Sequence, residues 1–209
     1  RGTDTWTPVP RIVDALDAAF YAAYGAVTPA GTRTLVALDV SGSMGMQISG
    51  LPISCREAAA ALALVTVATE PSCRVVGFTA GRQGFPSSAL HGLDITPRRR
   101  LDDVCRYTAA LPFGGTDCAL PMVWALQHRV AVDTFHIYTD NETWYGNIHP
   151  HQALQRYRQR MGIDARLVVV AMTGSRNSIA DPNDPGQLDI SGFDSAVPTL
   201  LADFSRGDV

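Results

Sequence analysis

Short aliphatic runs alternate with longer amphipathic stretches along the 209-residue chain. The runs are four to seven residues long, rich in Val, Ile, Leu and Ala, and are mostly followed by Ser, Gly, Thr or Asp. Such continuous runs are typical of strands that are buried on both faces of a sheet. The predicted strands span residues 34–40, 74–79, 135–139 and 167–172, with shorter candidates at 91–95 and 187–190.

Between these runs, apolar residues recur at the three- and four-residue spacing of helices. Ser54 and Glu57 have the spacing of a capping box, in which each side chain binds a backbone amide at the start of a helix. Pro121 is compatible with a helix only in its first turn, because proline has no amide hydrogen to donate. The predicted helices span residues 11–24, 54–69, 101–111, 117–129, 150–161 and 196–204.

Strands that alternate with helices predict an α/β protein with a mostly parallel sheet covered on both faces. We expect a Rossmann-like, doubly wound three-layer sandwich with about five parallel strands and one short antiparallel strand. The length fits one domain, so residues 1–209 are predicted to form a single unit, with the helix at about 11–24 packed on it. Ligands of such sheets bind beyond the carboxyl ends of the strands.

Charge and cysteine content limit the classes of function. The net charge of −3 and the pI of about 5.9 argue against an autonomous nucleic-acid-binding domain, which normally has a basic surface. The four cysteines are widely spaced, so we expect reduced thiols and a cytoplasmic protein. No apolar run reaches the roughly 20 residues of a membrane span. The chain begins with Arg1, from which we expect a processed chain or a fragment.

Oxygen-bearing side chains collect in three loops next to predicted strands or helices. Asp39, Ser41 and Ser43 follow the first strand at alternate positions, which directs their side chains to one side of an extended turn. Thr116 follows two glycines, and Asp140 follows the strand at 135–139. Because the carboxyl ends of parallel strands share one edge of the sheet, these five residues are candidate metal ligands.

Two carboxylates and three hydroxyls suit a hard divalent cation, which prefers oxygen ligands. We expect Mg²⁺, with Mn²⁺ or Ca²⁺ as alternatives. Ser41 and Ser43 would bind the ion directly, and the neutral hydroxyls would leave it able to attract one more acidic oxygen from a partner. Helix capping would explain the serines and Thr116, but it does not explain an aspartate at the end of both strands. Asp117 fits a helix cap better than a ligand.

The five residues, in this order, resemble the metal-ion-dependent adhesion site of von Willebrand factor A domains. A narrower resemblance is to the A domain of the Ro ribonucleoprotein autoantigen, a TROVE-module protein, and its bacterial relatives. The segments that carry it are ALDAAFY at 15–21, GGTDCALPM at 114–122, TDNET at 139–143, IADP at 179–182 and GFD at 192–194.

The Ro resemblance implies a partner and a setting. In that family, a ring of helical repeats binds non-coding Y RNAs and the ends of misfolded RNAs, and the A domain closes the ring. No such repeats occur in this sequence. The resemblance therefore implies a detached, non-catalytic domain of an RNA-binding protein, whose Y-like RNA would bind the repeat region of the parent protein.

Four residues after Asp140 are expected to form a ligand face around the ion. They are Asn141, Glu142, Trp144 and Tyr145. Exposed aromatic rings beside a cation could stack on a base or contact a partner protein, and the alternative is packing against the next helix. The partner at the ion would be an acidic protein side chain or an RNA phosphate.

Two other functions stay open. A metal-dependent phosphoesterase or nuclease would need a base near the ion, for which Glu142 and His149 are the candidates. The second open possibility is a structural domain whose metal site is vestigial. The sequence contains no phosphate-binding loop and no nucleophile elbow. The arginines at 98–100, and those at 156, 158 and 160 on one predicted helix, are expected to be solvated.

Overall fold

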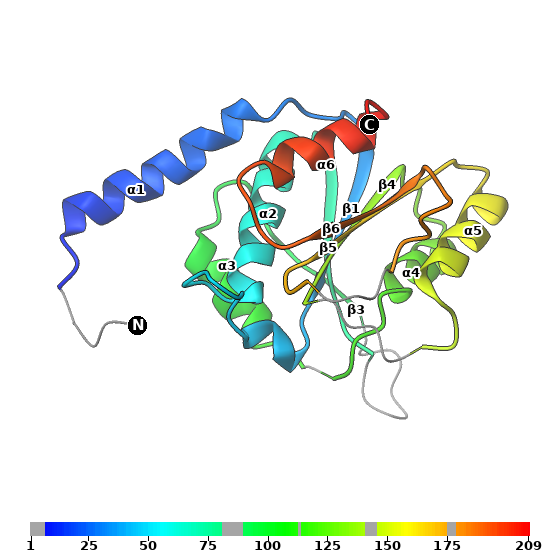
Figure 1. Ribbon diagram of the computed structural model, residues 1–209, viewed down its shortest axis with the longest axis horizontal. Coiled ribbons are helices and arrows are strands. Elements are labelled where there is room, and N and C mark those ends of the chain that lie inside the picture. Colours follow the sequence, from blue (N-terminus) through cyan, green and yellow to red (C-terminus); the bar gives the residue numbers. More distant parts are fainter. Residues whose placement is uncertain (1–6, 81–89, 113, 141–145, 175–178) are drawn as a thin grey trace.

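The structure is a computed structural model that describes residues 7–80, 90–112, 114–140, 146–174 and 179–209. Its centre is a six-stranded sheet in the order β3-β2-β1-β4-β5-β6 (Figure 1). The strands are β1 (Arg33–Asp39), β2 (Ser72–Phe78), β3 (Leu90–Gly92), β4 (Thr134–Thr139), β5 (Arg166–Ala171) and β6 (Gln187–Ser191).

All neighbouring strands are parallel except β2 and β3, which are antiparallel. The predicted α/β fold, with five parallel strands and one short antiparallel strand, is therefore confirmed. In the centre of the sheet, Leu38 of β1 is paired with Tyr138 of β4. This register places the residues that follow the two strands next to each other.

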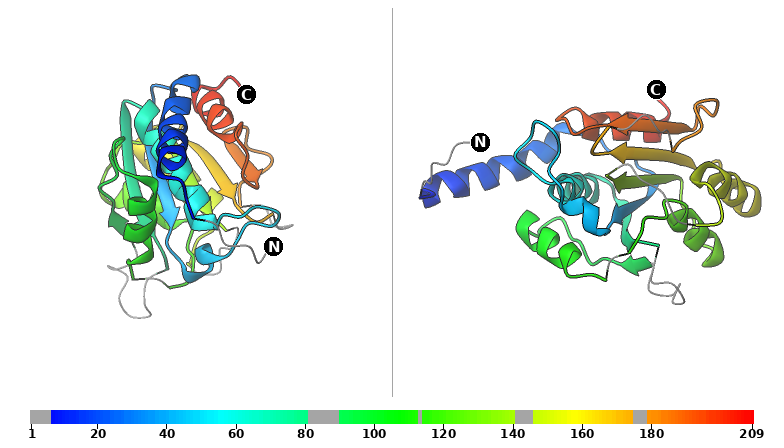
Figure 2. Two further views of the ribbon diagram at one scale, coloured as in Figure 1. Left: turned by 90° about the vertical axis from the view of Figure 1, so that its left-hand side faces the viewer. Right: turned by 60° about the horizontal axis from the view of Figure 1, so that its bottom comes forward.

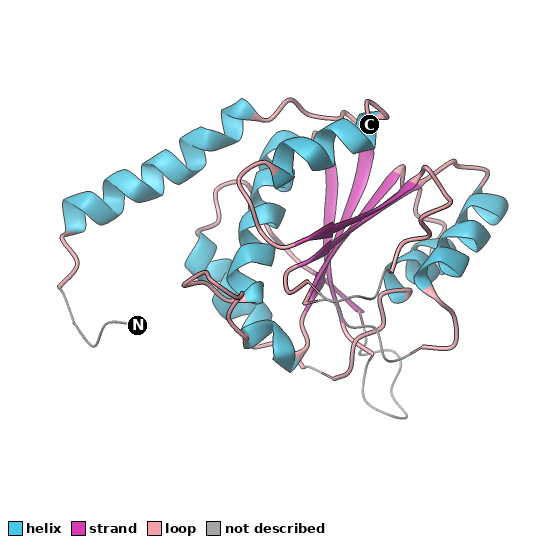
Figure 3. Ribbon diagram, viewed as in Figure 1, coloured by secondary structure: helices cyan, strands magenta, loops and turns pink. Residues whose placement is uncertain are grey.

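Helices cover both faces of the sheet (Figure 3). α2, α3 and α6 lie on one face, and α4 and α5 lie side by side on the other (Figure 1). The helices are α1 (Pro10–Ala22), α2 (Cys55–Thr69), α3 (Leu101–Ala109), α4 (Leu120–Gln127), α5 (Pro150–Met161) and α6 (Val197–Arg206), with short 3-10 helices η1 (Ala23–Ala26) and η2 (Gly42–Gly45).

Alternate side chains of each central strand enter two separate cores. In β1, Val36 and Leu38 pack in the core beneath α2, whereas Leu35 and Ala37 pack in the core beneath α4 and α5. All four are fully or almost fully buried. Burial on both faces explains why the strand sequences are continuous apolar runs.

The packing of α1 differs most from what the sequence predicts. It projects from the body of the protein (Figure 2), and none of its residues is buried. Ile12 and Leu16 are 53% and 66% exposed. Its last turn packs on the domain, where Phe20 and Tyr21 make edge-to-face contacts with Tyr24 of η1, and Asp17 lies 3.8 Å from Arg100. The contact between this helix and the domain therefore involves its carboxyl-terminal half.

Local capping fixes where two helices begin. The predicted capping box at the start of α2 is confirmed, because Ser54 accepts a hydrogen bond from the Glu57 amide and Glu57 accepts one from the Ser54 amide. α4 begins at Leu120, three residues later than predicted. The carboxylate of Asp117 accepts the Ala119 amide at 3.0 Å, so Asp117 closes a turn before the helix.

Two expectations drawn from composition can be compared with the structure. None of the four cysteines, all of which lie in the described part of the chain, forms a disulfide. Among the described residues, no helix is both long enough and apolar enough to cross a bilayer.

His136 on β4 is a fully buried titratable group. Its Nε2 lies 3.0 Å from the hydroxyl of Ser205, which itself donates to the carbonyl of Leu201. Burial lowers the pKa of His136 to about 4, whereas in an unfolded chain the pKa is about 6.5. The folded state therefore favours neutral His136. Its contribution to stability is complete above pH 6.5 and is lost as the pH falls towards 4.

We expect the free energy of unfolding contributed by His136 to fall by roughly 2 kcal/mol between pH 7 and pH 5. Urea unfolding of the wild type and of His136→Gln at each pH measures this contribution as the difference between the two proteins. All other titrating groups are common to both and cancel. Two curves that stay parallel from pH 7 to pH 5 would contradict the prediction.

Candidate metal centre

Asp39, the last residue of β1, lies at the centre of a buried cluster of oxygen atoms. Its side chain is 2% exposed. One carboxylate oxygen accepts the amide of Ser41 at 2.8 Å, and the other accepts the hydroxyls of Thr139 at 2.8 Å and Thr116 at 3.2 Å. These three donors orient the carboxylate and hold two loops against the end of β1.

Ser41 and Ser43 present their hydroxyls to each other across 3.1 Å. The turn of η2 brings the two side chains together, and Met44 within η2 is buried and anchors the turn in the core. On the other side, the guanidinium of Arg56 donates to the carbonyl of Ser41 at 3.3 Å. The serine pair is therefore held by packing and by a backbone contact, and both hydroxyl oxygens have lone pairs available for a ligand.

Asp140 is the least compensated group of the cluster. It is 2% exposed, and within the described part of the chain neither carboxylate oxygen has a hydrogen-bond partner. Only its backbone carbonyl is engaged, by the hydroxyl of Thr173. Removing a carboxylate from water without a partner is costly, and a bound cation would offset that cost. The orphaned oxygens of Asp140 thus fit a metal ion.

The charge of Asp140 acts on two neighbouring groups, Asp39 and Cys55. The pKa of Asp39 is raised to about 6, because burial and, to a smaller extent, the charge of Asp140 outweigh the hydrogen bonds from Ser41 and Thr139, which lower it. Burial, together with the charges of Asp140 and Asp39, raises the pKa of Cys55 to about 11. Cys55 begins α2, so the amino end of this helix faces the carboxylates and its dipole favours negative charge there.

The structure brings the five predicted ligands into one cluster. Hydrogen bonds connect Asp39 with Ser41 and Thr116, and Ser41 with Ser43, and the charge of Asp140 acts on Asp39. Their role as metal ligands stays a prediction. No group of three or more His, Cys, Asp or Glu side chains suited to a metal occurs among the described residues, so the site would depend on two carboxylates and three hydroxyls.

Sequence reasoning missed the contact of Thr139 with Asp39. The contact depends on the parallel pairing of β1 with β4, which places the two strand ends side by side and which the sequence alone does not give. The four residues expected to form a ligand face, Asn141, Glu142, Trp144 and Tyr145, lie outside the described residues.

His149, a candidate base for an enzyme, is located at the start of α5. Burial and the charge of His151 lower its pKa, and the charge of Asp189 raises it. The rings of His149 and His151 are 4.4 Å apart. Neither Asp39 nor Asp140 is among the groups that shift this pKa.

The sheet order and its helical layers are those of a von Willebrand factor A domain. The manganese-loaded Plasmodium vivax TRAP protein shares the fold, with a TM-score of 0.50 and 16% identity over 86% of this chain and 75% of that one. The crystal structure of the Deinococcus radiodurans Ro protein superimposes on the whole chain with a TM-score of 0.87 and 47% identity.

The family model of the Ro60 von Willebrand factor A domain matches residues 33–205, and the chain belongs to this family. The RNA-binding protein RO60 of D. radiodurans is 47% identical over the full chain, and that of Caenorhabditis elegans is 45% identical. The chain spans 38% and 31% of the length of these two relatives, and 41% of the crystallised Ro protein. The predicted relationship to Ro proteins is thereby confirmed.

Proposed function

We propose that this chain is a non-catalytic, divalent-cation-dependent docking domain of a Ro-type RNA-binding protein. Mg²⁺, or else Mn²⁺ or Ca²⁺, would bind at the cluster of five oxygen-bearing side chains. Those side chains are Asp39, Ser41, Ser43, Thr116 and Asp140. An acidic oxygen from a partner would complete the coordination of the ion.

One observation carries the metal proposal. Both carboxylate oxygens of Asp140 are buried without a hydrogen-bond partner among the described residues, beside a second buried carboxylate whose pKa is raised. Two carboxylates in this arrangement repel each other, and a cation between them removes both the repulsion and the unsatisfied oxygens. The manganese-loaded TRAP protein, which has the same fold, supports a metal at such a domain.

The ligand types favour docking over hydrolysis. Mg²⁺ keeps open positions when few carboxylates bind it, and three of the five ligands here are neutral hydroxyls. The ion therefore retains enough positive charge to attract a carboxylate or phosphate oxygen. A hydrolase would also need a base beside the ion, and the charges of Asp39 and Asp140 are not among those that shift the pKa of His149.

The proposal extends to the parent protein through its relatives, which are named RNA-binding proteins. Because the chain spans 38% and 31% of their lengths, we assign Y-like non-coding RNA to a helical-repeat region of the parent and partner docking to this domain. The setting that we propose for the parent protein is cytoplasmic.

Calorimetric titration of the chain with Mg²⁺, Mn²⁺ and Ca²⁺ tests the metal site, and an Asp- and Glu-containing peptide tests docking. We expect saturable metal binding, and peptide binding that requires the metal and disappears in EDTA. The absence of heat at millimolar metal would indicate a vestigial site. Metal-dependent turnover of RNA or phosphoesters that is lost in Glu142→Ala would replace docking with catalysis.

A further inference from the structure

A basic hollow of about 720 Å³ lies between the carboxyl ends of α4 and α5. Its walls are formed by Arg129, Arg156 and Arg160, with amides from Gln127 and Gln159 and an apolar floor from Leu126 and Met161. α4 and α5 both end where the strands of the sheet begin. The hollow, hereafter the arginine pocket, is therefore at the opposite end of the domain from the candidate metal centre.

The three guanidinium groups of the arginine pocket have no carboxylate partner in the described part of the chain. The acidic residues nearest in sequence are engaged elsewhere: Asp133 binds Arg33 at 2.5 Å, and Asp164 lies 3.7 Å from Arg158. Arg158 does not line the pocket and also pairs with Asp184. Three exposed arginines gathered in one concave site, with no acidic residue lining it, form a local positive field in a chain of net charge −3.

Arg129 has an unusual backbone conformation, with φ at +51°, the only positive φ of a non-glycine residue among those described. It occupies the position after the carboxyl cap of α4. There, the Arg129 amide donates to Leu126 and the Val130 amide donates to Ala125. Glycine is the usual residue in this capping motif, because other residues are strained in the left-handed region. An arginine that accepts this strain in a binding pocket points to a functional role.

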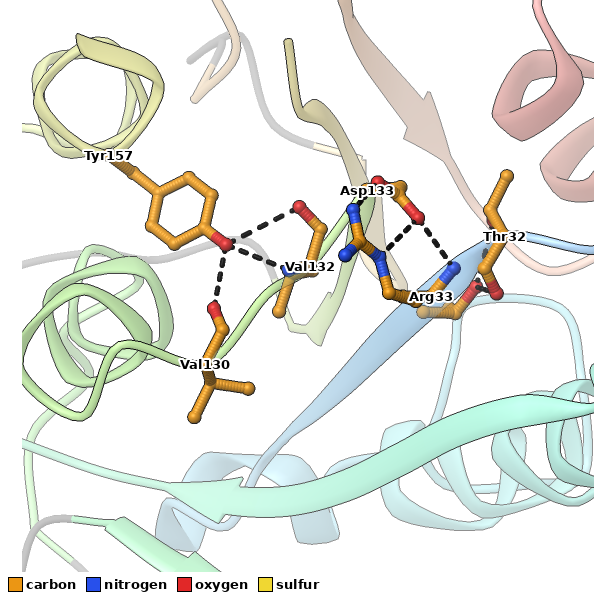
Figure 4. A network of polar contacts seen from close by, with 7 residues as sticks. Thr32, Arg33, Val130, Val132, Asp133 and Tyr157 are labelled. Atoms are coloured by element: carbon orange, nitrogen blue, oxygen red, sulfur yellow. Dashed lines mark hydrogen bonds and ion pairs between the residues drawn. The ribbon is translucent and has the colours of Figure 1, made fainter. Parts of the chain in front are cut away.

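Buried contacts fix the segment that carries Arg129. The hydroxyl of Tyr157, which projects from α5, donates to the carbonyl of Val130 at 2.7 Å and accepts the amide of Val132 at 2.8 Å (Figure 4). The same helix carries Arg156 and Arg160, four residues apart and hence on one face. Arg129 is thus held in a defined position relative to the other two arginines.

We propose that the arginine pocket binds the backbone of single-stranded RNA, so that its three arginines neutralise about three phosphates and one nucleotide enters the pocket. Guanidinium groups bind phosphate oxygens through paired, charge-assisted hydrogen bonds. The volume exceeds that needed for a phosphate alone, and Leu126 and Met161 offer an apolar surface to a ribose or base. The relatives named RNA-binding proteins favour this occupant over an acidic protein segment. The proposal does not depend on the metal site.

Fluorescence anisotropy with a 12-nucleotide labelled oligouridine RNA, in EDTA and 50 mM KCl, tests the proposal. We expect a dissociation constant of roughly 10–100 µM. The logarithm of the binding constant should fall with the logarithm of the salt concentration with a slope near −2, as for about three phosphates neutralised on a single strand. Arg156→Gln/Arg160→Gln should weaken binding at least tenfold and reduce the slope to about −0.7. The control Arg11→Gln/Arg98→Gln removes two exposed charges elsewhere and should change binding less than twofold.

The variant Arg129→Gly distinguishes a loss of RNA binding from a loss of stability. It removes one cation and relieves the left-handed strain, so we expect weaker RNA binding together with a melting temperature raised by about 2 °C. Competing ligands identify the occupant. Inorganic phosphate should displace RNA only at millimolar concentration, with the same arginine dependence.

Three results would overturn the proposal. The first is an equal loss of affinity in the control double variant, which would mean diffuse charge attraction. The second is tighter binding of an oligoglutamate peptide than of RNA with the same arginine dependence, which would assign the pocket to an acidic protein. The third is binding of phosphate without binding of RNA, which would assign it to a small anion.

Discussion

Asp140→Asn is expected to abolish metal binding and, in EDTA, to make the protein more stable than the wild type. In the wild type, both carboxylate oxygens of Asp140 are buried without a hydrogen-bond partner among the described residues. The substitution removes a ligand charge, so we expect the affinity for Mg²⁺ to fall at least a hundredfold. It also removes an uncompensated buried charge, so we expect the metal-free protein to gain about 2 kcal/mol.

The neighbouring carboxylate of Asp39 explains why Asp140→Asn weakens metal binding but stabilises the metal-free protein. Burial and the charge of Asp140 raise the pKa of Asp39 to about 6, above its value of about 3.9 in an unfolded chain. Ionised Asp39 therefore opposes folding, an effect that is complete above pH 6 and vanishes as the pH falls through 4. Neutralising Asp140 lowers this penalty, whereas a bound cation lowers it in the wild type.

Urea unfolding in EDTA and in Mg²⁺ measures both effects. The wild type should gain about 1.4 kcal/mol when Mg²⁺ is present at ten times its dissociation constant, and Asp140→Asn should gain nothing. Asp102→Asn, which removes an exposed carboxylate from α3, should behave like the wild type. A metal-free Asp140→Asn protein that is less stable than the wild type would show that Asp140 stabilises the fold by itself, and would remove the main support for the metal site.

The sequence was sufficient to predict the sheet, because two-sided burial makes each central strand a continuous apolar run. It did not predict that the first turns of α1 would project from the domain. The pattern of Ile12 and Leu16 indicates an apolar face, but it does not say whether this chain or another covers it, and here both side chains are exposed. The start of α4 was misplaced because Asp117 forms a turn with the Ala119 amide instead of opening the helix.

The candidate metal residues could be predicted because their residue types and order are specific and strand ends meet at one edge of a parallel sheet. Thr139 was not recognised, since its contact with Asp39 depends on the register of β1 with β4. The arginine pocket could not be predicted either. The arginines of α5 were expected to be solvated, and only the approach of the end of α4, with Arg129 in a left-handed conformation, turns two of them into a wall of a pocket.

The two sites occupy opposite ends of the sheet and have opposite charge. Carboxylates gather where the strands end, and unpaired arginines gather where the helices of one layer end. Two ligands could therefore bind without competing for the same surface. One is a partner that supplies an acidic oxygen to the ion, and the other is an RNA that supplies phosphates to the arginines. Each of the two proposals can fail without affecting the other.

Tyr157→Phe is expected to lower the free energy of unfolding by about 3 kcal/mol. Its hydroxyl is fully buried and binds the segment between α4 and β4. It donates a hydrogen bond to the Val130 carbonyl and accepts one from the Val132 amide (Figure 4). Phenylalanine would leave the buried Val132 amide and the Val130 carbonyl without their partner, and each unsatisfied group costs about 1–3 kcal/mol. Urea unfolding with tryptophan fluorescence measures the loss.

Tyr138→Phe is the matched control, because Tyr138 is also fully buried and loses the same single atom. Its hydroxyl makes only long contacts, at 3.3 Å with Thr66 and 3.5 Å with His136. Both partners have other hydrogen bonds, to Leu62 and Ser205 respectively. We therefore expect a loss of at most about 1 kcal/mol. Equal losses in the two variants would mean that removal of a buried hydroxyl, and not the anchoring of the backbone by Tyr157, determines the cost.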